Sequence, residues 1–206
     1  MKRQKNQFLK AIILSDEKLT TSLVSTILKW KSLKVFKTHC KSLEISCNGL
    51  VWLFTWFAFI YLFNKKSLYE IQINVLNGLI LDIILIAVLK SICRRRRPTV
   101  PNDMFVLGPD KYSFPSGHAS RASLVAAIFI CLYPVPKLLW MPLIAWCFSV
   151  CLSRIIIQRH YILDVFAGII IGCTEAYLLN LIWVNEITSI SVMNYILNEQ
   201  YYSDDE

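Results

Sequence analysis

Two of the three histidines in this chain stand in polar stretches that adjoin long apolar runs. Burying an imidazole beside such runs costs free energy, so a functional reason is the default hypothesis. His160 precedes Asp164 by four residues, about one helical turn, so the carboxylate can hold one ring nitrogen and leave the other free to attack. These residue types predict a histidine nucleophile with an orienting acid.

Cationic residues stand close to these histidines in the sequence. Lys90 and Arg97 are seven residues apart, two helical turns, so they point from one face if the helix continues to Pro98. Arg154 precedes His160 by six residues. Alone, the basic stretch around Lys90 would also suit a flank that follows the positive-inside rule. Together, the three cations provide what a phosphate site needs.

The sequence Pro-Ser-Gly-His ends at His118, directly before an apolar run. Backbone amides at a helix start bind anions, and Gly117 permits close approach of the backbone to a ligand. Ser116 and Gly117 are therefore predicted to hold phosphate beside His118. Taken alone, these residues would suit a helix cap followed by an interfacial histidine, but their combination with the other two blocks favours one site.

Apolar runs must position these residues, because 55% of the chain is hydrophobic. The longest runs cover residues 46–63, 73–89, about 122–135, 138–152 and 161–184. We therefore predict an all-α fold, an integral-membrane helical bundle of about five transmembrane helices plus an N-terminal interfacial helix. Asp82 and Glu175 lie inside these runs and are predicted to form helix–helix hydrogen bonds or to support the site.

The pattern divides the chain into three regions. They are a basic N-terminal segment over 1–45, a membrane-embedded domain over 46–186 and a C-terminal tail over 187–206. Residues 20–38 mix apolar side chains with four lysines, which makes spanning costly and favours an amphipathic helix at the interface. The predicted apolar side of this helix consists of Leu23, Ile27, Trp30 and Leu33.

The positive residues flank the predicted spans, although a net charge of +8 would also suit nucleic acid. We expect membrane lipids as partners and no nucleic acid. With an interfacial first helix, the polar loops 90–118 and 153–160 face the same side of the membrane as the N-terminus. A spanning helix over 20–38 would separate them from it, so the side on which the site lies stays open, as does the oligomeric state.

The ordered pattern K-x6-RP, PSGH and SR-x5-H-x3-D resembles the three-part signature of the type 2 phosphatidic acid phosphatase superfamily. It spans residues 90–164, and all eleven signature positions match. The resemblance implies a helical-bundle lipid phosphatase without metal or other cofactor, with His160 as nucleophile, Asp164 orienting it and His118 as general acid. It assigns phosphate binding to Lys90, Arg97, Ser116, Gly117 and Arg154.

A second resemblance extends from about Leu43 into the last apolar run. The segments RRRRP, DMFV and DKYSFPSGHASRAS are similar to those of the presqualene diphosphate phosphatase family. This implies hydrolysis of polyisoprenoid diphosphates and monophosphates, with presqualene, farnesyl and geranylgeranyl diphosphates as substrates, in the endoplasmic reticulum and nuclear envelope membrane. Arg94, Arg95 and Arg96 are compatible with the extra charge of a diphosphate, although juxtamembrane arginines also bind anionic headgroups generically.

Other functions would use the same residues. A broader lipid phosphate phosphatase, acting on phosphatidate or sphingosine phosphate, would share the site and differ in its apolar groove. A catalytically silent membrane scaffold is disfavoured by the intact His118, His160 and Asp164. A soluble vanadate-dependent haloperoxidase, which has a similar signature, does not fit the long uncharged runs, and a transporter would need more polar residues along a path.

Overall fold

A computed structural model describes residues 2–28, 33–99, 111–133 and 135–196. Helices account for most of these residues. The described ranges contain no strand, apart from an isolated bridge between Arg96 and Tyr112. The all-α prediction is therefore confirmed for this part of the chain.

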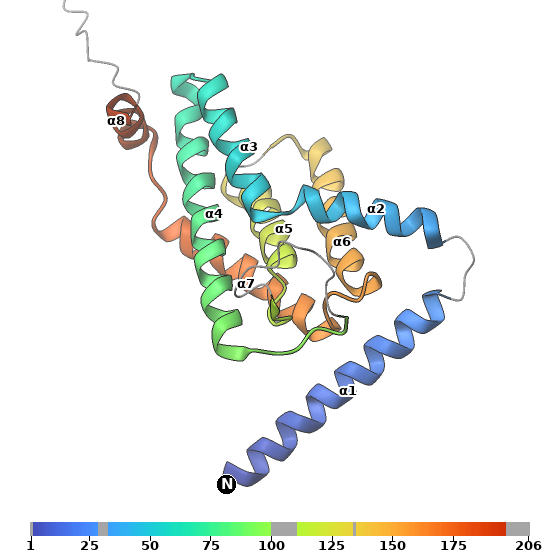
Figure 1. The fold of residues 1–206 in the computed structure, drawn as a ribbon. Coiled ribbons are helices and arrows are strands. Elements are labelled where there is room, and N and C mark those ends of the chain that lie inside the picture. The colour runs from blue at the N-terminus through green and yellow to red at the C-terminus, as the bar shows by residue number, and fades with distance from the viewer. Residues whose placement is uncertain (1, 29–32, 100–110, 134, 197–206) are drawn as a thin grey trace, which may run out of the picture.

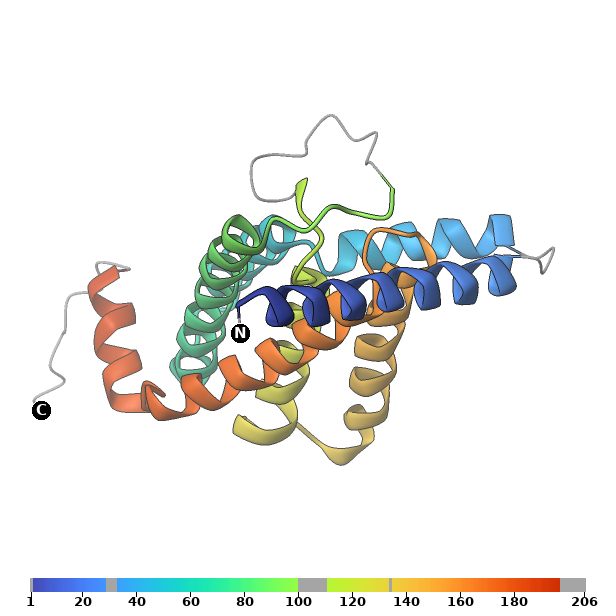
Figure 2. The ribbon, with the colours of Figure 1, turned by 90° about the horizontal axis from the view of Figure 1, so that it is seen from below.

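The helices are α1 (Lys2–Leu28), α2 (Leu33–Ser46), α3 (Gly49–Leu62), α4 (Lys66–Cys93), α5 (Gly117–Ala127), the π-helical η2 (Ile128–Leu132), the 3-10 turn η3 (Lys137–Leu139), α6 (Trp140–Ile156), α7 (Ile162–Leu181) and α8 (Glu186–Ile196). In Figure 1, α5 lies in the middle of the bundle, with α3, α4, α6 and α7 around it. Figure 2 shows α1 passing across the bundle, and α1 is in contact with both α6 and α7. The apolar core lies between α4, α5 and α7, where Leu79, Leu124 and Leu179 are buried.

Three described helices are long and apolar enough to cross a membrane: α4, α7, and α6 together with η3. The segments His39–Ser46 and Gly49–Leu62 pass the same test together, but they are bent by 57°, so the number of spans is three or up to four. The helix Gly117–Leu132 is apolar but shorter than these candidates. The apolar helices are those of an integral membrane protein, while the predicted count of five spans is not confirmed.

Helices α5 and α7 are in backbone contact. Gly168 and Gly172 on α7 form the G-x-x-x-G pattern that lets membrane helices approach closely. A Cβ atom at Gly172 would lie 2.1 Å from Ser120 O, and one at Gly168 would lie 2.5 Å from Ser116 O. This contact fixes the start of α5 against the first half of α7, the two segments that carry His118 and Asp164.

A buried polar cluster joins these helices to α4 and to the link between α2 and α3. Arg121 on α5 donates to Asp82 on α4 at 2.5 Å and to Cys47 O at 3.0 Å. Ser120 donates to Glu175 on α7 at 3.2 Å. A buried acid in an apolar surrounding needs such partners. The helix–helix interaction predicted for Asp82 and Glu175 is therefore what the structure shows.

The N-terminal segment differs from the prediction. The single amphipathic helix expected over 20–38 is divided between the end of α1 and the start of α2, while 29–32, with Trp30, lie outside the described residues. Leu23, expected on the apolar side of that helix, is exposed. Among the described side chains of α1, the buried ones are Asp16, Thr20 and Val24. The buried face is partly polar because Asp16 and Thr20 accept hydrogen bonds from the first amides of α7.

The C-terminal segment is also more ordered than a tail. Residues 187–196 form most of α8, which packs against α4. Met193 is buried there together with Tyr69 and Ile73 of α4. Apolar side chains therefore pack α8 against the bundle. Residues 197–206 lie outside the described part of the chain.

We expect Gly172→Ala to destabilise the protein. Alanine usually favours a helix over glycine by about 1 kcal/mol, but its Cβ would overlap Ser120 O, and relieving that overlap costs about 1–3 kcal/mol. The measurement is the melting temperature in detergent, with Cys173→Ala as the control, because the neighbouring Cys173 is exposed. An unchanged or raised melting temperature in Gly172→Ala would show that α5 and α7 are not in backbone contact.

Candidate active site

His160 lies in the short loop between α6 and α7, where a backbone oxygen holds its ring. Its Nδ1 atom lies 2.7 Å from Ser113 O. A carbonyl oxygen can only accept a hydrogen bond, so Nδ1 carries the ring proton and Nε2 keeps its lone pair. His160 is only 2% exposed, so packing holds the ring in this orientation. The structure thus defines Nε2 as the nitrogen that can attack.

The end of α6 brings Arg154 next to this histidine. Beyond α6 the chain turns sharply, with Gln158 in the left-handed region at φ 56°. The amides of Arg159 and His160 both donate to Arg154 O, at 3.1 and 3.2 Å. The five residues between Arg154 and His160 therefore form a tight turn that places one phosphate-binding candidate beside the candidate nucleophile.

Asp164 lies near the same ring but does not make the hydrogen bond expected from its spacing. Its Oδ2 atom is 3.8 Å from His160 Nδ1, a distance for electrostatic attraction and too long for a hydrogen bond. The carboxylate instead accepts from Tyr161 N at 2.9 Å and from Arg95 Nη1 at 2.8 Å. The hydrogen-bond partner of Nδ1 is therefore Ser113 O, with the Asp164 carboxylate close by.

The surroundings keep the His160 ring neutral. Burial is the largest cause that lowers its pKa, to about 4, and the positive charges of Arg97 and Lys90 lower it further. The nearby carboxylate of Asp164 acts in the opposite direction and offsets only part of this effect. At neutral pH the ring therefore has the lone pair that a nucleophile needs.

Lys90 and Arg97 both lie near His160, but they are not on one continuous helix as predicted. Helix α4 ends at Cys93, and Arg94 turns the backbone into the left-handed region at φ 48°, so two continuous helical turns from Lys90 to Arg97 are not formed. Lys90 is buried in the last turn of α4, and Arg97 Nε donates to Tyr112 O at 3.4 Å. Both positive charges nevertheless lower the pKa of His160, the candidate nucleophile.

Glu44 on α2 connects His118 to Arg154. The Nε2 atom of His118 lies 3.1 Å from Glu44 O, and Arg154 Nη1 lies 3.1 Å from Glu44 Oε1. Arg154 is 1% exposed and also donates to Cys40 O at 3.3 Å. The structure thus brings the second histidine and the third cation together, with an acid from the N-terminal segment between them.

The Pro-Ser-Gly-His sequence begins α5 as predicted, but some of its hydrogen-bonding groups already have partners within the protein. Ser116 is the N-cap, and its hydroxyl accepts from Ala119 N at 3.4 Å. Its amide donates to Asp164 O at 3.0 Å. A Cβ atom at Gly117 would lie 3.1 Å from the Ile86 side chain, so the glycine also permits close packing of α4 and α5.

The three arginines that precede Arg97 have different environments. Arg94 and Arg96 are exposed. Arg95 has a side chain that is 12% exposed and pairs with Asp164 and Asp16 at 2.8 Å each. Two carboxylates therefore pair with the terminal nitrogens of Arg95, whereas Arg94 and Arg96 are exposed.

Sequence reasoning missed three contributors to the site and the pairing of a fourth. The three are the Ser113 carbonyl, Asp16 and Glu44, and the fourth is Arg95, which was named from the sequence without its two acids. No side-chain pattern indicates a backbone acceptor, and nothing distinguishes Arg95 within a run of four arginines. Asp16 and Thr20 do have a one-turn spacing in a basic segment, which is a weak signal. Within the described ranges, no group of three or more His, Cys, Asp or Glu side chains is placed to hold a metal ion.

The fold and the site define a class of protein: an α-helical membrane protein with two histidines and several cations at one end of its bundle. The chain belongs to the PAP2 superfamily, whose family profile matches residues 71–187. That match covers more than half of the chain and contains every candidate site residue named from the sequence.

Two curated proteins illustrate the relationship. "Probable lipid phosphate phosphatase beta" of Arabidopsis thaliana is 33% identical over 126 residues, covering 48% of this chain and 59% of that protein. "Decaprenylphosphoryl-5-phosphoribose phosphatase" of Mycolicibacterium smegmatis is 34% identical over 84 residues, covering 39% of this chain and 43% of that protein. The chain thus spans only about half the length of these relatives.

Two crystal structures have a similar fold. LpxE of Aquifex aeolicus superimposes with a TM-score of 0.57 at 27% identity, covering 78% of this chain and 94% of that one. The transmembrane PAP2 type phosphatidylglycerolphosphate phosphatase of Bacillus subtilis superimposes with a TM-score of 0.60 at 22% identity, covering 84% and 86%. This likeness is one of fold, and it agrees with the three described helices that are long and apolar enough to cross a membrane.

We expect the His160 ring to remain neutral well below pH 6.5. A pKa lowered to about 4 means that the proton is taken up only as the pH falls toward that value. The measurement is a titration of the ring nitrogens by NMR in protein labelled with 15N-histidine, with His160→Asn used to assign the signals. A midpoint at or above 6.5 would contradict the burial and the cationic surroundings described here.

Proposed function

We propose that this protein is a metal-independent lipid phosphatase with His160 as its nucleophile. The observation that carries the proposal is the buried His160 ring, whose Nδ1 is bound to Ser113 O at 2.7 Å while Nε2 keeps its lone pair. Such a nitrogen can attack phosphorus. Fixed cations around it can stabilise the charge on the transferred group without a metal.

In the proposed reaction, Nε2 of His160 attacks the terminal phosphorus in line with the leaving oxygen. The bond to that oxygen breaks, and His118 supplies its proton, so the lipid leaves as an alcohol or as a monophosphate. A phosphohistidine remains. Neutral His118 then takes a proton from water, the water oxygen attacks phosphorus, and inorganic phosphate leaves as His160 recovers its lone pair.

Each remaining site residue has an electrostatic task in this reaction. Lys90, Arg97 and Arg154 hold the phosphate oxygens, together with the backbone at Ser116 and Gly117. The imidazole becomes positively charged when it is phosphorylated. Asp164, at 3.8 Å from Nδ1, and Ser113 O then stabilise that positive charge. Preorganised charges of this kind are worth most where water is excluded.

We propose polyisoprenoid diphosphates and monophosphates as substrates, with presqualene, farnesyl and geranylgeranyl diphosphates as examples. The segments RRRRP and DKYSFPSGHASRAS, which are similar to the presqualene diphosphate phosphatase family, support this choice. The mycobacterial relative is named for a decaprenylphosphoryl compound. The same resemblance is the ground for proposing the endoplasmic reticulum and nuclear envelope as the location.

A broader lipid phosphate phosphatase is the second candidate. The Arabidopsis relative is named as a lipid phosphate phosphatase. The pairing of Arg95 with two carboxylates also favours this candidate, because it leaves fewer cations for a second phosphate group. Phosphatidate and sphingosine phosphate would then be substrates at the same site.

The test compares wild type with His160→Ala in detergent, with EDTA present. We expect wild type to release phosphate and the variant to lose at least about 1,000-fold in kcat, because the covalent route is closed. Farnesyl diphosphate, farnesyl monophosphate and phosphatidate are offered separately. An acid-labile phosphoenzyme should form in wild type and be absent from the variant.

The outcomes separate the candidates. Preference for either farnesyl substrate supports the polyisoprenoid assignment, whereas preference for phosphatidate replaces it with the broader phosphatase. Activity that EDTA abolishes would contradict the metal-independent mechanism. If a folded wild type releases phosphate from none of the three substrates, a catalytically silent scaffold becomes the better description.

A further inference from the structure

The N-terminal helix α1 has a buried polar face. Asp16 is 6% exposed and Thr20 is 3% exposed, one turn apart on a helix that is otherwise largely exposed where its side chains are described. Burying a carboxylate is costly unless it has partners. The partners of these two side chains lie in the active-site region, and neither residue belongs to the family signature or to the stretch matched by the family profile.

The first partners are the amides at the start of α7. Thr20 Oγ1 accepts from Ile162 N at 3.2 Å, and Asp16 Oδ1 accepts from Leu163 N at 3.1 Å. The first amides of a helix have no acceptor inside that helix. Residues from α1 therefore cap α7, the helix whose first turn carries Asp164, from a distant part of the chain.

The second partner is Arg95. Asp16 Oδ2 accepts from Arg95 Nη2 at 2.8 Å, while Arg95 Nη1 donates to Asp164 Oδ1 at 2.8 Å. The guanidinium also lies over the Tyr161 ring, 4.1 Å from its centroid. One arginine thus connects a carboxylate of α1 with the carboxylate beside the candidate nucleophile, His160.

The backbone of Arg95 completes the connection. Ser113 N donates to Arg95 O at 2.8 Å, and Ser113 O is the group that holds His160 Nδ1 at 2.7 Å. Arg95 therefore fixes both neighbours of Nδ1: Ser113 through its main chain and Asp164 through its side chain. Asp16 holds Arg95 in the position from which it does so.

We propose that Asp16 and Thr20 make α1 a positioning element of the active site. Asp16 acts through Arg95 on the two acceptors that orient His160, and both residues fix the start of α7. The inference rests on the proposed function, because it concerns the same nucleophile. It adds that efficient turnover depends on a helix outside the three signature blocks, and that neither residue contacts the substrate.

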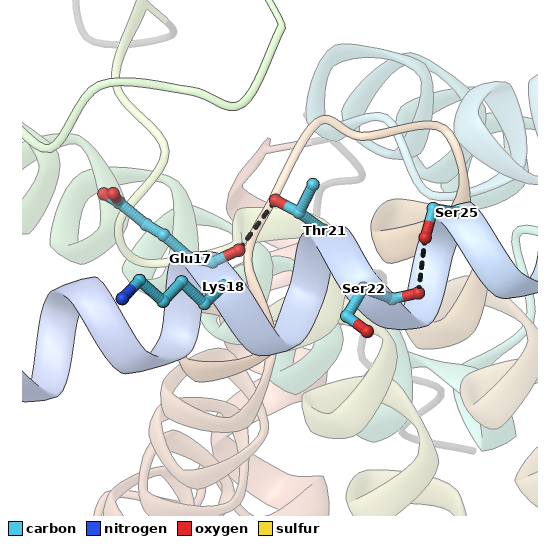
Figure 3. Close-up of a pocket in the computed structure, with 5 residues that line it drawn as sticks. All are labelled: Glu17, Lys18, Thr21, Ser22 and Ser25. Carbon is cyan, nitrogen blue, oxygen red and sulfur yellow. Dashed lines mark hydrogen bonds between the residues drawn. The ribbon is translucent and has the colours of Figure 1, made fainter.

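The chain offers matched controls on the outer side of the same helix. Glu17 and Thr21 are neighbours of Asp16 and Thr20 with the same chemistry. Figure 3 shows both, beside Lys18, Ser22 and Ser25, along an open hollow on the surface of α1. Thr21 Oγ1 donates only to Glu17 O in its own helix, at 2.7 Å, and the Glu17 carboxylate lies 4.0 Å from Arg95.

The experiment uses the full chain in detergent and compares Asp16→Asn with Glu17→Gln, and Thr20→Val with Thr21→Val. We expect kcat to fall about 10- to 100-fold in the first member of each pair, because small displacements of a reacting group have effects of this size. KM should change little, since the cations that hold phosphate are untouched. The control variants should stay within about twofold of wild type, and Thr20→Ser should recover most of the activity because it restores the hydroxyl.

Two further measurements make the result decisive. The effect of Asp16→Asn should shrink in an Arg95→Met background, because the connection is already broken there. The ring nitrogens of His160, observed by 15N NMR, should lose the single Nδ1-protonated form in Asp16→Asn and keep it in Glu17→Gln. This NMR readout does not require turnover, so it tests the positioning role even if wild type hydrolyses none of the substrates and the proposed function fails.

The inference is overturned if a folded Asp16→Asn has the kcat and the His160 signals of wild type. It is also overturned if Asp16→Asn lowers activity by the same factor with and without Arg95, because the effect would then not pass through that residue. If Asp16→Asn fails to fold, the comparison of Thr20→Val with Thr20→Ser decides: equal activity in these two variants counts against the positioning role.

Discussion

The hydrogen bond from His160 Nδ1 to Ser113 O sets the chemistry of the whole site, because it decides which ring nitrogen carries the proton. The other nitrogen then has a lone pair in a place where burial and the charges of Lys90 and Arg97 oppose protonation. Burial is the larger of these influences, and the repulsion of a proton by the two cations adds to it. Together they keep the ring of the candidate nucleophile neutral.

Arginines that lie inside an apolar bundle need acidic partners, and Arg95, Arg121 and Arg154 each have at least one. Arg95 has Asp16 and Asp164, Arg121 has Asp82, and Arg154 has Glu44. In each case at least one acid comes from a helix remote in sequence. Because losing one member of a buried pair leaves an uncompensated charge, these pairs also define how the helices must be placed.

The glycines of α7 and the polar face of α1 both determine the position of α7, and with it the position of Asp164 beside His160. Gly168 and Gly172 let the backbone of α5 lie against α7, which sets the distance between the helix of His118 and that of Asp164. Asp16 and Thr20 hold the beginning of α7 from outside the bundle. The candidate nucleophile thus lies in a loop of which both neighbouring helices are fixed by specific contacts.

The sequence by itself determined the all-helical membrane class and the residues that could do the chemistry. Long apolar runs can only be satisfied as helices in a bilayer, and the spacing of His118, His160 and Asp164 with their cations is a local property of the chain. Spacing alone did not settle the number of spans, because the helix Gly117–Leu132 is shorter than the other candidates and the pair His39–Ser46 and Gly49–Leu62 is bent by 57°.

Only the tertiary structure decided which groups hold these residues. The four-residue spacing predicted that Asp164 lies near His160, but the hydrogen bond of His160 Nδ1 goes to a backbone carbonyl, while the carboxylate accepts from Arg95 and Tyr161 N. The contacts of α1 and α2 with the site join residues more than 70 positions apart, and no periodicity in the sequence encodes such pairs. They depend on where the helices pack, which is set by burial and close contact across the whole bundle.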